Sequence, residues 1–142
     1  MPLKVEALQI FHNLSKNEIE KSLHCSLSKV LTFPKGSYIF QQDESPTHLY
    51  LVLSGTVLIE QFSTNGRIMY AEYLHEGSCF GEVDLLLDKQ YYEFSAQAKT
   101  EVSVLAVTRH FFAGACPNNC VHHGQVIFNM LYLFDEAAQR NT

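Results

Sequence analysis

The chain has 142 residues, of which 46% are hydrophobic, so a single domain spanning 1–142 can form a core without disulfide staples. The formal net charge is −5, and the ten lysines and arginines are scattered, which argues against the basic stripe of a nucleic-acid-binding protein. No apolar run has the length of a signal peptide core or a membrane span, so we expect a cytoplasmic protein without direct nucleic-acid or membrane partners.

The first thirty residues predict a helical lead-in to the domain. Apolar residues recur there at intervals of three and four, which is the period of an amphipathic helix. Ser15 and Glu18 have the spacing of a capping box, which favours a helix start at this point. We expect two short helices, over residues 4–12 and 16–27.

The middle of the chain, residues 31–108, predicts a block of short β-strands separated by polar turns. Turn residues cluster at PKG (34–36), DESPT (43–47) and STNG (63–66), and the runs between them are rich in strand-forming residues. STNG joins two alternating runs and therefore indicates a hairpin. The expected strands cover residues 37–42, 48–53, 57–62 and 67–74, followed by one long or two consecutive strands within 94–108.

The stretch GSCFGEVDLLLDKQYYEFSAQA at 77–98 predicts a tight turn and a brief helix that begins near Glu82. The free backbone N–H groups at such a turn attract negative charge, as in a cradle for a small anion. Lys89 is the only cation in this stretch, so the expected arginine partner of a phosphate is absent.

The last part of the chain, 109–142, predicts C-terminal helices, chiefly one from Asn119 to Gln139. Four of its apolar residues recur at helical spacing and could form a seam between two copies of the chain, which favours a homodimer; these are Ile127, Met130, Leu131 and Phe134. A second set could cover the β-strands of the same chain: Val126, Leu133 and Ala138.

Cysteine and histidine gather at RHFFAGACPNNCVHHG, which contains Cys116, Cys120 and His123. Thiolate and imidazole are good zinc ligands, but C-x3-C beside paired histidines is not an established finger spacing. We therefore expect no bound metal and no cofactor, with a metal or redox sensor left as an alternative. The sequence has no nucleophile elbow, Walker loop or HExxH motif, which favours a non-enzymatic protein.

Helices, then strands, then a helix predict an α+β domain built on an antiparallel β-roll of jelly-roll type. FPKGSYIFQQDESPTHLYLVLSGTVLI and NGRIMYAEYLHEGSCFGEVDLLL together resemble the cyclic nucleotide-binding domain family over nearly the whole chain. The resemblance implies a β-roll flanked by helices, with a phosphate-binding cassette at 77–96. The chain stops where bacterial regulators of this family begin a DNA-binding domain, so we do not expect a complete transcription factor.

In the family, the cassette glycine lets the backbone approach the cyclic phosphate, a glutamate binds the ribose hydroxyl, and an arginine pairs with the phosphate. Gly81 and Glu82 match the first two. The arginine would precede a Ser-Ala pair, but Phe94 stands there, and a shifted alignment offers Tyr92 or Glu93. The resemblance therefore implies weak or absent cyclic nucleotide binding at a set of pocket residues comprising Gly81, Glu82, Val83, Phe94, Ser95 and Ala96.

The leading hypothesis is a regulatory module that senses a small-molecule effector, either a cyclic nucleotide or another small anion, and moves its C-terminal helix in response. Tyr91 and Tyr92 are candidates for the pocket wall or for surface packing. One alternative is a ligand-free interaction domain in which Phe94 and these tyrosines fill the cavity.

Overall fold

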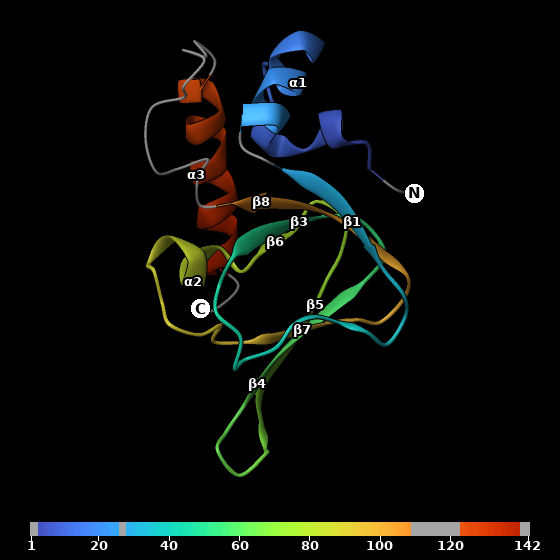
Figure 1. Ribbon diagram of the computed structural model, residues 1–142, viewed down its shortest axis with the longest axis vertical. Helices are drawn as coiled ribbons and strands as arrows, with labels where there is room; N and C mark the ends of the chain where they lie inside the picture. The colour runs from blue at the N-terminus through green and yellow to red at the C-terminus, as the bar shows by residue number, and fades with distance from the viewer. Residues whose placement is uncertain (1–2, 26–27, 109–122, 140–142) are drawn as a thin grey trace.

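The computed structural model describes residues 3–25, 28–108 and 123–139. Two four-stranded antiparallel sheets face each other and form a β-roll, with the N-terminal helices and the C-terminal helix gathered at one end (Figure 1). This arrangement confirms the predicted α+β fold with an antiparallel roll between flanking helices.

The N-terminal segment contains one α-helix, where two were expected. Residues 4–12 form two 3-10 turns, η1 (Val5–Ala7) and η2 (Gln9–Phe11), separated by Leu8 in an extended conformation. The helix α1 runs over Lys16–Cys25. Its predicted capping box is present, because the Ser15 N–H donates to Glu18 at 2.8 Å and the Glu18 N–H donates to the Ser15 hydroxyl at 3.2 Å.

The first sheet has the order β1-β8-β3-β6. Its strands are β1 (Lys29–Phe33), β8 (Val102–Thr108), β3 (His48–Ser54) and β6 (Cys79–Phe80). The expected lead-in of 1–30 is wrong at its end, because Lys29 and Val30 already pair with Ala106 and Leu105 of β8.

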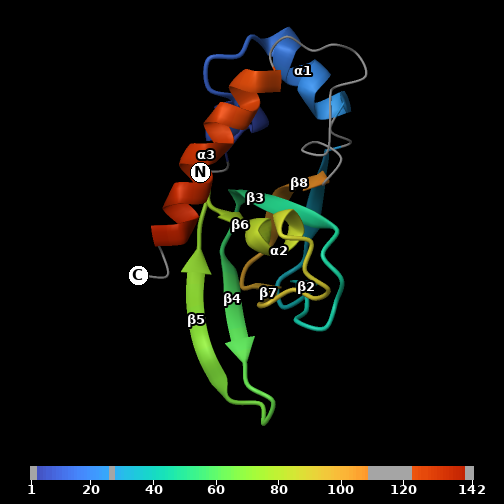
Figure 2. The ribbon, with the colours of Figure 1, turned by 90° about the vertical axis from the view of Figure 1, so that its left-hand side faces the viewer.

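The second sheet has the order β2-β7-β4-β5. Its strands are β2 (Tyr38–Phe40), β7 (Ser95–Ala98), β4 (Val57–Phe62) and β5 (Ile68–Leu74). Residues 94–108 thus hold two strands in different sheets. The predicted β4–β5 hairpin is present and projects beyond the roll, away from α1 (Figure 2).

Both faces of the first sheet are buried at β3, because alternate residues of this strand point into two different cores. Leu49 and Leu51 pack in a cluster with the N-terminal segment and the C-terminal helix. Tyr50 and Val52 pack between the two sheets in a second cluster with Phe40, Phe80 and Tyr92. The roll interior is therefore aromatic, and the candidate site borders this second core.

The C-terminal helix α3 covers His123–Gln139; residues 119–122 of the expected helix lie outside the described part. Asn129 anchors it, since its side-chain amide donates to the carbonyls of Ile10 at 3.0 Å and His12 at 2.8 Å. Val126 and Leu133 pack against the core as expected. Met130, predicted to face a partner, is only 1% exposed and belongs to the same core.

Candidate functional site

A glycine turn joins β6 to the short helix α2 (Glu82–Leu86), as the sequence predicts. Gly81 has φ 80° and precedes the helix. A Cβ placed on it would lie 3.4 Å from both the His48 carbonyl oxygen and Cε1 of Tyr92. Glycine is favoured here because the conformation is left-handed, and the Tyr92 ring lies within van der Waals distance of this position.

A cavity of about 340 Å³ opens beside α2. This volume lies within the range of small-molecule sites. Its described walls come from β2, β4, β6, α2 and the segment before β7, and consist of Phe40, Ile59, Phe80, Gly81, Glu82, Val83, Asp84, Glu93 and Phe94.

Four of the six residues predicted for the pocket line this cavity: Gly81, Glu82, Val83 and Phe94. Ser95 and Ala96 are not among the lining residues. The Ser95 hydroxyl accepts a hydrogen bond from the Gln42 N–H at 3.0 Å, and Ala96 is buried where β7 pairs with β2 and β4. Ser95 therefore holds the chain after β2 in the position seen here.

Phe94 forms part of the cavity wall. Its half-buried ring meets the edge of Tyr70 with the ring centroids 5.6 Å apart. A cavity remains beside Phe94, so this ring does not occupy all the space next to α2.

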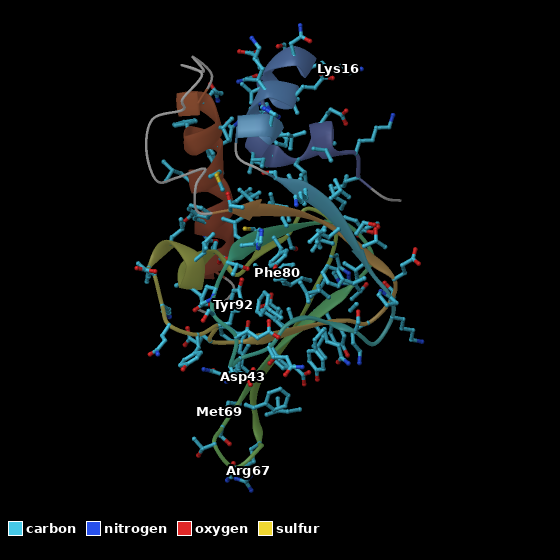
Figure 3. All side chains as sticks on the ribbon, in the orientation of Figure 1. Lys16, Asp43, Arg67, Met69, Phe80 and Tyr92 are labelled. Atoms are coloured by element: carbon cyan, nitrogen blue, oxygen red, sulfur yellow. The ribbon has the colours of Figure 1, made fainter. Side chains whose placement is uncertain are left out.

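Tyr92 lies deep in the roll near Phe80 (Figure 3). The six predicted pocket residues did not include Tyr92. Its ring is 3% exposed and stacks on Phe40 with the centroids 3.7 Å apart. Its hydroxyl donates to the His48 carbonyl at 2.8 Å and accepts from the N–H groups of Thr47 and His48 at 3.2 and 3.3 Å. The signal available in the sequence was the shifted alignment, which places Tyr92 where the family has arginine.

Three residues with carboxyl groups line the cavity: Glu82, Asp84 and Glu93. Burial raises the pKa of the Asp84 carboxyl above its usual value. Lys89 lies beside two of these groups, with its ammonium nitrogen 3.0 Å from Glu93 Oε2 and 3.5 Å from Asp84 Oδ1. The hydrogen bond to Glu93 raises the pKa of Lys89, which therefore stays charged.

Arginine is distant from the cavity in the described part of the chain. Arg67, the only arginine among residues 3–25, 28–108 and 123–139, lies exposed at the tip of the β4–β5 hairpin. Figure 3 shows this tip far from Phe80 and Tyr92.

The sequence and fold of this chain match a known protein family. The family model of the cyclic nucleotide-binding domain matches residues 30–119, which is more than half of the chain. The chain belongs to the cyclic nucleotide-binding domain family. The match begins at Val30 in β1 and includes all the other strands of the roll, α2 and the cavity-lining segments.

Relatives of this cyclic nucleotide-binding domain include a receptor protein and a solute carrier. The cyclic AMP receptor protein of Thermus thermophilus is 33% identical over a match that covers 70% of this chain and 45% of that protein. Solute carrier family 9 member C1 of Mus musculus is 30% identical, with 64% of this chain and 9% of that protein covered. The chain thus matches less than half the length of either relative.

A solved structure has the same fold over nearly the whole chain. The catabolite activator protein of Thermus thermophilus superposes with a TM-score of 0.73 at 26% identity, covering 94% of this chain and 59% of that one.

The structure describes only part of the segment in which cysteine and histidine gather. Cys116 and Cys120 lie outside the described residues, and within the described ones no group of three or more histidine, cysteine, aspartate or glutamate side chains is placed to hold a metal ion. Among the described helices, none is long and apolar enough to cross a bilayer.

Proposed function

We propose that this chain is a non-enzymatic sensor module whose cavity beside α2 takes a small molecule other than a cyclic nucleotide. The observation that carries the proposal is the position of Tyr92 against Gly81. By the family resemblance, this glycine is where a cyclic phosphate approaches the backbone. Here the phosphate would meet a buried aromatic ring whose hydroxyl is already hydrogen-bonded to residues 47 and 48.

The charge around the cavity supports the same proposal. Phe94 stands before Ser95 and Ala96, and no described residue lining the cavity is a cation. A charge-assisted hydrogen bond contributes about 1.5–3 kcal/mol, so loss of the arginine alone lowers affinity by about tenfold or more. Carboxylates at the cavity add repulsion of a phosphate.

The open volume favours a ligand over a ligand-free interaction domain. Tyr92 fills the space against Gly81, but about 340 Å³ remains beside Phe94. A ligand there would contact α2, whose Leu85 belongs to the same buried cluster as Val126 and Met130 of α3. Because these packed side chains connect α2 with α3, ligand binding would change which position of α3 is most populated.

Calorimetric titration with cyclic AMP and cyclic GMP tests the proposal. We expect no binding in the micromolar range for the unmodified chain, and a gain of about tenfold or more in the Phe94→Arg variant, because it restores a cation near the cavity. Phe94→Leu is the matched control, since it changes the same wall without adding charge. Micromolar binding to the unmodified chain would contradict the proposal, and no gain in Phe94→Arg would contradict the alignment on which it rests.

We also propose that α3 mediates a homodimer, through a face that differs from the predicted seam. Met130 and Phe134 of that seam pack against the chain's own core, whereas Leu131 is 58% exposed. The exposed face, called here the outer stripe, has the spacing i, i+3, i+4 and i+7 and consists of Phe128, Leu131, Tyr132 and Asp135.

Sedimentation equilibrium tests the dimer. A fully buried Leu side chain contributes about 1.5–3 kcal/mol, so Leu131→Glu is expected to give a folded monomer. Leu87→Glu is the matched control, because Leu87 is exposed on another part of the surface and should leave the dimer intact. A monomer at high micromolar concentration of the unmodified chain, or unfolding of Leu131→Glu, would contradict the proposed interface.

A further inference from the structure

We propose that the ligand of the cavity beside α2 is a small organic cation with an apolar body. The inference rests on the proposed function, namely that this cavity takes a ligand other than a cyclic nucleotide. It adds the chemical class of that ligand, which follows from the charges and surfaces of the cavity itself.

The first observation is the charge of the walls. Three of the nine described lining residues carry carboxyl groups, and none carries a positive charge. Lys89 lies beside two of these carboxyl groups, and its one ammonium group is shared between Asp84 and Glu93. One ammonium group is therefore shared by two carboxyl groups at a cavity with no described cation in its wall, so the site favours a cation over an anion.

The second observation is the state of Asp84. Its side chain is 6% exposed, and its Oδ1 atom accepts no hydrogen bond from any described residue. Lys89 lies 3.5 Å from this oxygen, at the far limit of hydrogen-bonding distance. A buried carboxylate is costly, and although Oδ1 itself is covered, a positive charge in the adjoining cavity would offset part of that cost through space.

The third observation is the apolar remainder of the cavity. Phe40, Phe80 and Phe94 contribute three aromatic rings, and Ile59 and Val83 contribute aliphatic groups. Aromatic faces attract organic cations, and the attraction grows when water is excluded. An ammonium group with a hydrocarbon or aromatic body satisfies both parts of the wall, whereas an inorganic cation would leave the aromatic part unused.

The test compares three phenylalkyl compounds of similar size that differ in charge: phenethylammonium, phenethyl alcohol and hydrocinnamate. Each is titrated at millimolar concentration into the complete chain, with binding followed by calorimetry and by chemical-shift changes. We expect phenethylammonium to bind about tenfold or more tightly than hydrocinnamate, with the alcohol in between. Equal affinities, no binding of the ammonium compound, or preference for hydrocinnamate would overturn the inference.

Two charge variants sharpen the test. Lys89→Met removes the competing ammonium group and is expected to tighten phenethylammonium binding severalfold, whereas Glu93→Gln is expected to weaken it severalfold. The matched controls are Lys21→Met and Glu20→Gln, at exposed positions on α1, which should change nothing. Weaker binding of phenethylammonium to a folded Lys89→Met variant would overturn the inference, because it would mean that Lys89 serves the ligand.

Cyclic AMP in the same titrations separates the two proposals. Micromolar binding of cyclic AMP overturns the proposed function. If neither cyclic AMP nor phenethylammonium binds, the prediction that the cavity does not bind cyclic nucleotides still holds. Only the inference that its ligand is an organic cation is then overturned.

Discussion

Replacing Gly55 with alanine is expected to lower the free energy of unfolding by about 3 kcal/mol or more, enough to unfold a marginal domain. Gly55 lies between β3 and β4 with φ 89°, where a side chain is strained. A Cβ built there would lie 2.3 Å from the Glu101 carbonyl oxygen and 2.7 Å from Thr100 Oγ1. The obstacle is mainly backbone, so it cannot move aside cheaply.

The contacts around Gly55 explain why this turn cannot relax. The Thr56 N–H donates to Thr100 Oγ1 at 3.0 Å, and the Lys99 N–H donates to the Thr56 carbonyl at 2.9 Å. These bonds hold the β3–β4 turn against the β7–β8 turn. Because each turn joins one sheet to the other, a shift here would disturb both sheets.

Gly66→Ala is the matched control, measured by urea unfolding under the same conditions. Gly66 also has a positive φ, of 83°, but no atom lies within 4 Å of a Cβ built there. Only the backbone strain remains, so we expect a loss of about 1 kcal/mol. Similar losses in both variants would mean that the close approach at Gly55 contributes nothing.

Local patterns in the sequence predicted the elements whose structure depends on local contacts. The capping box of Ser15 and Glu18 predicted the start of α1, and the turn at 63–66 predicted the β4–β5 hairpin. The strand β1 was missed because its pairing partner is β8, about seventy residues later in the chain. Its residues are mostly exposed, so no buried period marked it as a strand.

Periodicity in α3 indicated apolar faces but not which of them meets the roll. Met130 follows the same spacing as Leu131, yet only Met130 packs inside. The choice depends on how α3 is rotated, and Asn129 fixes that rotation through the Ile10 and His12 carbonyls. A polar residue in the middle of an apolar helix gave no indication of these distant partners.

The sequence predicted the site residues that lie together in one short motif. It did not predict the residues that folding brings to the site from distant parts of the chain. Gly81 and Glu82 lie in one short motif and both line the cavity. The location of Tyr92 depends on stacking with Phe40 and on backbone groups of residues 47 and 48, which are distant in sequence. Adjacent tyrosines at 91 and 92 look alike in the sequence, although one is exposed and the other buried.

Truncating Tyr92 to alanine is expected to cost about 3–5 kcal/mol of unfolding free energy, because it removes a buried ring and leaves a cavity between Phe40 and Gly81. Tyr92→Phe keeps the stack on Phe40 but removes the hydroxyl. Its loss leaves the His48 carbonyl and the N–H groups of Thr47 and His48 without this partner, at a cost of about 1–3 kcal/mol.

Tyr91 supplies the matched control for both Tyr92 variants. Its side chain is 52% exposed, so Tyr91→Ala and Tyr91→Phe should each change the free energy of unfolding by no more than about 0.5 kcal/mol. Urea unfolding of the four variants therefore shows whether the ring at Tyr92 contributes more to the free energy of unfolding than the exposed ring at Tyr91. If Tyr92→Phe were as stable as the unmodified chain, the hydroxyl would not hold residues 47 and 48. The ring would then be held against Gly81 by its burial and its stack on Phe40 alone.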